Sequence, residues 1–313
     1  MKTVLVYNPT AGPWDMLRPL KRLAAYLRTC GWDTELVQTE QEGDAGRYAR
    51  DSAARHIDML LVAGGDGTIN EVANGLSGTN TVLGIVPVGT GNILAQQLRM
   101  PALLPVAPMV RDIGDVLSNS RVQRVDLGII NNRGFVCWAG LGLDAEIATQ
   151  MEPRPRHIKR LRTLPYIFTG LAVASEYSGV RAQFRFGDRV VRTRTLMAVA
   201  TNIQLYAAFF QIAPQGCMDD GLLDIFVFKG LNFSYALRSA VEMLGKRHQD
   251  SPNVMHVLAS SMEVETSPTV AVHLDGDPMG HTPASVRMRP GALRLLVPSN
   301  APETLFRKSP EHL

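Results

Sequence analysis

The chain has only three cysteines, Cys30, Cys137 and Cys217, and they lie far apart in its 313 residues. An odd number at such wide spacing matches neither a disulfide framework nor a set of zinc ligands, so we expect a reducing, cytoplasmic setting. Charge of one sign is scarce too, because 32 Lys and Arg are balanced by 29 Asp and Glu, with a net charge of +3. The composition therefore argues against nucleic acid as a partner.

Motifs of several enzyme classes are absent as well. No Gly-x-Ser-x-Gly turn occurs, which argues against a Ser-His-Asp hydrolase, and no His-x-x-x-His or Glu-x-x-His pair suggests a metal site. The one Gly-Lys pair, Gly245-Lys246, lacks the upstream glycine of a Walker-type phosphate loop. The uncharged window between Arg194 and Asp219 contains Asn, Gln and Pro, so we do not expect it to span a membrane.

The first part of the chain alternates β-branched apolar runs with helical patterns. We expect strands at 4–7, 34–37, 59–63 and 83–86, and helices at 17–27, 47–55 and 69–76. This alternation predicts a parallel sheet with helices on both faces, which binds ligands at the carboxyl ends of its strands. The chain is long enough for two domains, so we assign this α/β N-terminal domain to residues 1–122.

Short strands dominate after residue 122. They are expected at 125–130, 135–138, 182–186, 190–200, 223–228, 262–265, 270–274 and 293–297, with helices at 157–177 and 233–246. Asn131–Gly134 and Gly187-Asp188 are typical of hairpin turns. The pattern predicts a mainly antiparallel β-sandwich C-terminal domain over residues 123–298, with a tail at about 299–313 that can return to the first domain.

The most informative segment follows the third expected strand. Residues 60–63 run into Gly64-Gly65-Asp66-Gly67-Thr68 and then directly into the helical pattern at 69–76. Glycines let a phosphate approach the backbone, and the helix N-terminus offers N–H groups and a positive dipole end. Asp66 can hold a magnesium ion or its water shell there, and Thr68 can cap the helix or bond a phosphate oxygen. Alone, the segment fits equally well a tight turn in which Asp66 only caps the helix.

A second glycine-rich turn, Gly89-Thr90-Gly91-Asn92, follows the next strand. Because the carboxyl ends of parallel strands meet at one edge, the two turns are expected to converge on one anion site. Asn8 to Gly12, after the first strand, adds a small-residue loop at the same edge, although alone it would be an ordinary turn.

These three segments resemble the nucleotide-binding lobe of the diacylglycerol kinase catalytic family, which includes sphingosine and ceramide kinases. Residues 64–71 match the family's Gly-Gly-Asp-Gly-Thr-x-Asn-Glu, residues 87–92 match its Pro-x-Gly-Thr-x-Asn, and the resemblance covers nearly the whole chain. It implies an NAD kinase/phosphofructokinase-like first domain and an ATP-dependent lipid kinase that moves the γ-phosphoryl group to a lipid hydroxyl. The ATP contacts that it implies are Asn8, Thr39, Gly64, Gly65, Asp66, Gly67, Thr68, Asn70, Glu71, Thr90, Gly91 and Asn92.

A metal site is implied in the second domain. Asp219-Asp220-Gly221-Leu222-Leu223-Asp224 resembles the family's Asp-Asp-Gly-x-Leu-Asp, a loop that in bacterial members holds a structural magnesium ion. By that resemblance, Asp220 and the main-chain carbonyls of Cys217 and Leu222 bind Mg²⁺. An acidic Gly turn before a strand is otherwise commonplace.

Two further carboxylates, Asp275 and Asp277, stand in a turn after the strand 270–274. Phosphoryl transfer to a hydroxyl needs a group that orients it and accepts its proton, which a carboxylate within hydrogen-bond reach can do. The family's counterpart is Leu-Asp-Gly-Glu, and here Asp277 replaces the Glu. The resemblance thus makes Asp275, Asp277 and Asp66 the catalytic candidates, with Asp275 slightly favoured as the base; on turn chemistry alone, a solvated pair fits as well.

The only dense basic run, Arg154–Arg162, precedes an apolar helical pattern. Such a run can hold a protein transiently at an anionic bilayer, at about 1 kcal/mol per basic residue, although ordinary exposed helices carry similar runs. We therefore expect a lipid substrate at a membrane surface and peripheral association. The sequence does not distinguish a monomer from a homodimer.

Two other functions compete with a lipid kinase. An NAD kinase shares the Gly-Gly-Asp-Gly strand turn and a β-rich second domain, but Asn70-Glu71, the second turn and the Asp-Asp-Gly loop argue against it. A nucleotide-sensing protein without catalysis is the rival from another class. Replacing Asp66 or Asp275 would separate the two classes, because a sensor forms no phosphorylated product.

Overall fold

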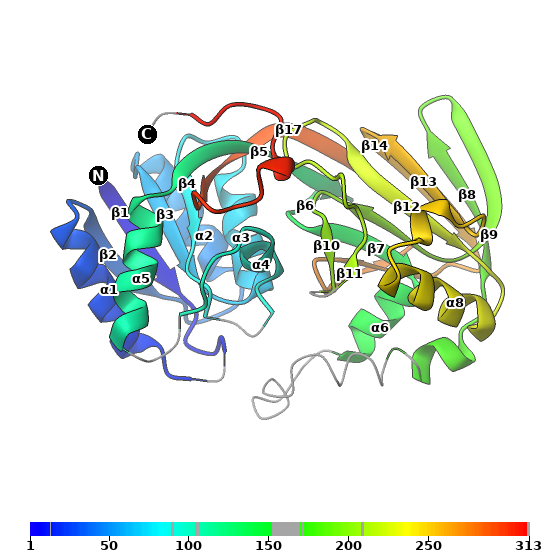
Figure 1. Ribbon diagram of the computed structural model, residues 1–313, viewed down its shortest axis with the longest axis horizontal. Helices are drawn as coiled ribbons and strands as arrows, with labels where there is room; N and C mark the ends of the chain where they lie inside the picture. Colours follow the sequence, from blue (N-terminus) through cyan, green and yellow to red (C-terminus); the bar gives the residue numbers. More distant parts are fainter. Residues whose placement is uncertain are drawn as a thin grey trace. The chain divides into compact units, whose positions relative to one another are not determined.

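The computed structural model describes residues 1–12, 14–88, 91–103, 107–151, 170, 172–207 and 210–311. The chain forms two compact units, shown in Figure 1. Residues Met1–Leu127 together with Pro290–Leu313 make up the α/β unit, and residues Gly128–Arg289 make up the β-rich unit.

The α/β unit is built on a parallel sheet with the strand order β17-β4-β3-β1-β2. Its strands are β1 Lys2–Tyr7, β2 Asp33–Gln38, β3 Met59–Ala63, β4 Val82–Ile85 and the C-terminal half of β17 Ala284–Val297. Its helices are α1 Leu17–Thr29, α2 Asp44–Ala54, α3 Asp66–Leu76, α4 Ile93–Gln97 and α5 Ala107–Ser118. The predicted parallel α/β class is confirmed.

Helices cover both faces of this sheet, because its strands are apolar on both sides. Leu5 and Leu61 pack into one buried cluster with Leu23 of α1 and Ile113 of α5. On the opposite face, α2 lies over β1 and packs against α3. A strand buried on both faces needs a continuous apolar run, which β3 supplies with Met-Leu-Leu-Val-Ala.

The β-rich unit is mainly antiparallel, as the sequence predicts. Its strands are the C-terminal end of β5 Arg121–Ile130, β6 Arg133–Phe135, β7 Trp138–Gly142, β8 Val180–Phe186, β9 Arg189–Thr201, β10 Leu205–Tyr206, β11 Phe210–Gln211, β12 Leu223–Lys229, β13 Val254–Ala259, β14 Ser261–Ser267, β15 Ala271–Leu274, β16 Asp277–His281 and the start of β17. Helices α6 Leu143–Met151 and α8 Phe233–Leu244 and the short η2 His248–Asp250 accompany them, and residues 172–176 are helical as well.

The long strand β9 organises this unit. Its first half pairs with β8, and its second half pairs with β7 on one side and β12 on the other. The expected hairpins are present: Ile130 pairs with Arg133 across Asn131-Asn132, both at positive φ, and Phe186 pairs with Arg189 across Gly187-Asp188. Positive φ at both central residues is the geometry of the tight turns that match strand twist.

The unit boundaries differ from the expected limits at residues 122 and 298. The chain passes between the units within β5 and within β17, so each boundary falls inside a strand. The second half of β17 belongs to the α/β unit because Arg294 and Leu295 pair in parallel with Val82 and Leu83 of β4. The C-terminal segment, with η3 Glu303–Leu305, also lies in the α/β unit, where Glu311 N–H donates to the carbonyl of Val122.

Other differences are local. The expected strand 135–138 is broken, because β6 ends at Phe135 and β7 begins at Trp138. Helix α6 was not predicted, and most of the expected helix 157–177 lies outside the described residues, as does the basic run Arg154–Arg162. None of the helices in the described part of the chain is long and apolar enough to cross a membrane.

Candidate functional site

Four loops follow the carboxyl ends of neighbouring parallel strands in the α/β unit. Asn8 comes after β1, Thr39 after β2, Gly64 after β3 and Pro87 after β4. The N–H of Asn8 donates to the carbonyl of Ala63 at 2.9 Å, and the N–H of Thr39 donates to the carbonyl of Tyr7 at 3.0 Å. These hydrogen bonds connect the ends of adjacent strands at one edge of the sheet.

The turn after β3 leaves room at the start of α3. A Cβ atom on Gly64 would lie 2.5 Å from the Cβ of Thr68, so only glycine lets the first turn of the helix pack this closely on the strand. Next to it, no heavy atom lies within 4 Å of the Cβ position of Gly65, the N-cap residue of α3. Open space therefore adjoins Gly65 at the N-terminal, positive dipole end of α3.

Asp66 and Asn92 lock the two glycine-rich turns together. Asp66 Oδ1 accepts the N–H of Ile93 at 2.8 Å, and Asn92 Nδ2 donates to the carbonyl of Gly64 at 2.9 Å. Gly91 makes the approach possible, because its Cβ would lie 2.7 Å from Asp66 Oδ2. The structure brings Asp66, Gly91 and Asn92 into contact, while Thr90 lies outside the described residues.

The loop after β1 joins the same group. Asn8 Nδ2 donates to Thr68 Oγ1 at 3.3 Å, and Asn8 Oδ1 accepts the N–H and hydroxyl of Thr10. Asn70, one turn into α3, is nearly buried and its side-chain oxygen accepts the amide of Asn74 at 2.7 Å. Asn8 and Thr68 therefore extend the site, whereas Asn70 contacts its own helix.

Glu71 holds the start of α2. Its two carboxylate oxygens accept the N–H of Gly43 at 3.1 Å and the N–H of Gly46 at 3.4 Å. Asp44 completes this anchor by accepting the N–H groups of Glu40 and Gln41 and the guanidinium of Arg47. The pKa of Asp44 is lowered to about 2, first by Arg47 and then by the two backbone N–H groups. The two acids fix the segment that connects Thr39 to α2.

In the β-rich unit, the Asp275 carboxylate accepts hydrogen bonds from the backbone at the break between β6 and β7. Its Oδ2 accepts the N–H of Val136 at 2.9 Å, and its Oδ1 accepts the N–H groups of Cys137 at 3.0 Å and Trp138 at 2.8 Å. These three N–H groups would otherwise be orphaned at the strand break. Asp275 has a φ of 46°, a conformation that Asp tolerates. Asp277 follows as the half-buried first residue of β16.

A buried polar chain lies beside that turn and was not predicted. His273 Nε2 contacts Asp144 Oδ2 at 2.6 Å, and the hydroxyl of Tyr206 donates to the other oxygen of Asp144. The N–H of Gly276 donates to His273 Nδ1 at 3.2 Å, which places the proton of a neutral ring on Nε2. Gly276 lies between Asp275 and Asp277, so these hydrogen bonds connect the acidic turn to Asp144 of α6.

The Asp-Asp-Gly loop has its own internal contact. Asp220 Oδ1 accepts the N–H of Leu222 at 3.0 Å across Gly221, while Asp219 is fully buried. A carboxylate with main-chain carbonyls of Cys217 and Leu222 would be an all-oxygen donor set, which suits Mg²⁺. Within the described ranges no group of three His, Cys, Asp or Glu side chains could hold a metal, so such a site would depend on carbonyls and water.

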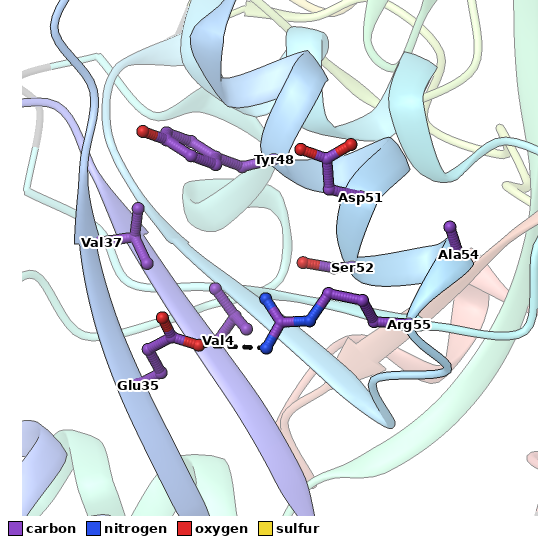
Figure 2. Close-up of a pocket in the computed structure, with 8 residues that line it drawn as sticks. All are labelled: Val4, Glu35, Val37, Tyr48, Asp51, Ser52, Ala54 and Arg55. Carbon is purple, nitrogen blue, oxygen red and sulfur yellow. Dashed lines mark hydrogen bonds and ion pairs between the residues drawn. The ribbon is translucent and has the colours of Figure 1, made fainter.

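Figure 2 shows a separate cleft between β2 and α2. Glu35 and Arg55 form an ion pair at 3.4 Å across it, with Val4 at its floor and Tyr48 above. It lies along the middle of the strands, away from the loops at their carboxyl ends, and we assign no function to it.

The fold and the contacts between the glycine-rich turns together define a two-unit protein in which these turns meet at the carboxyl edge of a parallel sheet. Comparison with known proteins gives the family. The diacylglycerol kinase catalytic domain matches residues 2–130, and the YegS C-terminal NAD kinase beta sandwich-like domain matches residues 138–297. The chain belongs to the diacylglycerol kinase catalytic domain family with a YegS-like C-terminal domain, which confirms the resemblance seen in the motifs.

Similar proteins include bacterial diacylglycerol kinases. That of Bacillus subtilis (strain 168) is 26% identical over 281 residues, covering 89% of this chain and 90% of the relative. That of Staphylococcus haemolyticus is 26% identical over 283 residues, covering 90% and 83%. A crystal structure of a diacylglycerol kinase from Bacillus anthracis str. Sterne has a TM-score of 0.75 at 23% identity and covers 96% of this chain and 98% of that one. This likeness supports the fold.

Proposed function

We propose that the protein is an ATP-dependent lipid kinase that transfers the γ-phosphoryl group of ATP to a lipid hydroxyl, with diacylglycerol or a related lipid as acceptor. The observation that carries the proposal is the locking of the two glycine-rich turns through Asp66 and Asn92, beside the open N-terminus of α3. Backbone N–H groups aimed into open space at a helix N-terminus are the chemistry that binds phosphate oxygens.

Each group at this edge has a role in the proposal. The N–H groups around Gly65 and Gly67 bind phosphate oxygens, and Thr68 and Asn8 add polar contacts. Asp66 keeps the turns in register and brings negative charge to the place where hydrated Mg²⁺ accompanies the nucleotide. Bound Mg²⁺ supplies neutralisation of the charge that develops on the phosphate oxygens.

The acidic turn of the β-rich unit supplies the proton acceptor. Both oxygens of Asp275 already accept backbone N–H groups, so this residue is better suited to holding the turn than to accepting a hydroxyl proton. We therefore favour Asp277 as the base, in contrast to the slight preference for Asp275 from the sequence. The proposed structural Mg²⁺ at Asp220 would stabilise a loop of the same unit.

The test uses labelled ATP and Mg²⁺ with diacylglycerol, sphingosine and ceramide in mixed micelles, and NAD as a parallel acceptor. We expect a phosphorylated lipid and unchanged NAD. Phosphorylated NAD with inert lipids would favour the NAD kinase, whereas nucleotide binding without any product would favour a sensor.

The Asp66→Asn variant probes the site itself, and Asp58→Asn is its matched control. Asp58 precedes β3 and Asp66 follows it, so the two acids lie at opposite ends of one strand. At its own end, Asp58 Oδ2 accepts the N–H of Lys2 at 2.7 Å. We expect Asp66→Asn to lose lipid phosphorylation by 10²-fold or more, on the order of an electrostatic group in a phosphoryl-transfer site. Equal activity of both variants would contradict the proposed site.

A further inference from the structure

Helix α8 turns an apolar stripe toward solvent. Leu237, Val241 and Leu244 have exposed fractions of 46%, 60% and 67%, and their i, i+4, i+7 spacing puts them on one side of the helix. The only buried residues of α8 are Ser239 and Met243. A surface helix normally points its apolar stripe at the core, so this stripe indicates an interaction surface.

Other residues of α8 hold the helix on the fold without the stripe. Phe233 and Ala236 pack against a buried cluster that includes Leu143 of α6 and Val173. The helix also contacts β11 and η2, and Figure 1 shows it at an outer edge of the β-rich unit. The stripe is therefore free of the packing that fixes the helix in the fold.

The charges around the stripe favour one kind of partner. Arg238 and Glu242 pair with each other at 2.7 Å, so the acid of the helix is already neutralised. Lys246 and Arg247, just after the helix, are exposed and form no ion pair within the described part of the chain. Three aliphatic side chains beside two uncompensated cations are complementary to a bilayer with anionic headgroups.

We propose that α8 is a docking face for an anionic lipid bilayer: Leu237, Val241 and Leu244 enter the headgroup boundary, and Lys246 and Arg247 contact lipid phosphates. The inference rests on the proposed function, because a lipid acceptor resides in a bilayer. A second copy of the chain fits this face less well, since it would desolvate both cations while Glu242, the acid of α8, is already used by Arg238.

Vesicle sedimentation tests the docking face directly. The full-length protein is mixed with large unilamellar vesicles of phosphatidylcholine alone or with added phosphatidylglycerol. We expect binding to the anionic vesicles that weakens with salt, and at least a tenfold loss in the Leu237→Gln/Val241→Gln/Leu244→Gln variant. Lys246→Gln/Arg247→Gln is expected to lose roughly fivefold per charge on anionic vesicles only.

Two matched variants control for general surface effects. Leu258→Gln removes another exposed leucine, on β13, and Arg189→Gln/Arg287→Gln removes two exposed charges elsewhere in the β-rich unit. Both should bind vesicles as the unchanged protein does. Equal binding of the stripe variant and the unchanged protein, or no binding by either, would overturn the proposal. So would a stripe variant that changes only from dimer to monomer in sedimentation velocity.

Activity on dispersed lipid separates this inference from the proposed function. With a short-chain diacylglycerol below its critical micelle concentration, the stripe variant should keep the rate of the unchanged protein, and with vesicle-borne lipid it should lose tenfold. If neither the unchanged protein nor the stripe variant phosphorylates the dispersed lipid, diacylglycerol fails as the acceptor, while sedimentation still decides whether α8 docks. Unchanged activity on both forms of lipid would overturn the docking face alone.

Discussion

Asp275 and Asp277 are two residues apart, yet their surroundings differ. Asp275 accepts three backbone N–H groups from Val136 to Trp138 and thereby satisfies the break between β6 and β7. Asp277 begins β16 and pairs in the ladder with Leu274. One acid is thus built into the backbone structure, and the other stands at the start of an edge strand.

Substituting each acid separately should show that Asp275 contributes to stability and Asp277 to catalysis. Asp275→Asn places an amide opposite three N–H donors, so we expect the free energy of unfolding to fall by about 2 kcal/mol, the cost of leaving buried donors unsatisfied. Asp277→Asn should keep its thermal midpoint and lose kcat by about 10²-fold or more, as for a general base. Asp188→Asn, in another exposed hairpin turn, serves as the control. A stable Asp275→Asn variant that has lost kcat would reverse the two roles.

The buried chain from Tyr206 through Asp144 to His273 should affect both stability and turn position. Tyr206→Phe removes the hydroxyl that donates to Asp144, and we expect a loss of about 1 kcal/mol in urea unfolding, typical of one hydrogen bond. The kcat should also fall while the KM for ATP stays constant, because His273 then holds the acidic turn less firmly. Tyr235→Phe, on exposed α8, is the matched control. A lower KM or unchanged kcat would argue that the chain only stabilises the fold.

At the scale of elements, Glu71 couples α3 to α2. Its carboxylate caps the N–H groups of Gly43 and Gly46, and the capped segment leads back to Thr39 at the sheet edge. Glu71→Ala should raise the KM for ATP about fivefold, equivalent to the ~1 kcal/mol of a helix cap, with little change in kcat. Glu42→Ala changes an exposed acid of the same loop and should leave the KM unchanged. A Glu71→Ala variant that loses kcat alone would instead place Glu71 at the reacting phosphate.

The same loop should carry a pH dependence through Asp44. Its pKa is about 2 in the folded chain, below the ordinary 3.8, so its ionised form stabilises the fold fully above pH 3.8 and this contribution is lost as the pH falls toward 2. The difference in unfolding free energy between the unchanged protein and Asp44→Asn should therefore be largest above pH 5 and shrink below pH 4. Urea titrations at several pH values measure it. A difference that is constant from pH 6 to pH 2.5 would contradict the assignment.

Much of the element pattern could be predicted from the sequence because its signals are local. Apolar runs and glycine-rich turns place β3 and α3 within a few residues, and two parallel strands in succession imply that the turns after them meet. The contact between His273 and Asp144 joins residues 129 apart, and no local pattern carries it. The break between β6 and β7 could not be predicted for the same reason, because the N–H of Val136 donates to Asp275, which is distant in the sequence.

For the whole molecule, unit membership could not be predicted from the run of strands, since β17 is one continuous strand that serves both units. Its first half pairs with β14 in antiparallel fashion, and its second half pairs with β4 in parallel. Each unit nevertheless has its own buried cluster, with Leu61 and Ile113 in one and Phe184 and Ile225 in the other. Separate cores predict that a ligand bound by one unit stabilises that unit first.

Tryptophan fluorescence can follow the unfolding of each unit separately, because Trp14 and Trp32 lie in the α/β unit and Trp138 lies in the β-rich unit. In a Trp138→Phe variant, the fluorescence of Trp14 and Trp32 follows the thermal unfolding of the α/β unit. ATP with Mg²⁺ at one hundred times its Kd should raise the midpoint of this transition, because binding contributes about 2.7 kcal/mol to the stability of the unit. In a Trp14→Phe/Trp32→Phe variant, the transition reported by Trp138 should move much less. Adding Asp66→Asn should abolish the shift in the first variant. Equal shifts in both reporters would mean that β5 and β17 make the units unfold together, and the core of one unit would then depend on the nucleotide held by the other.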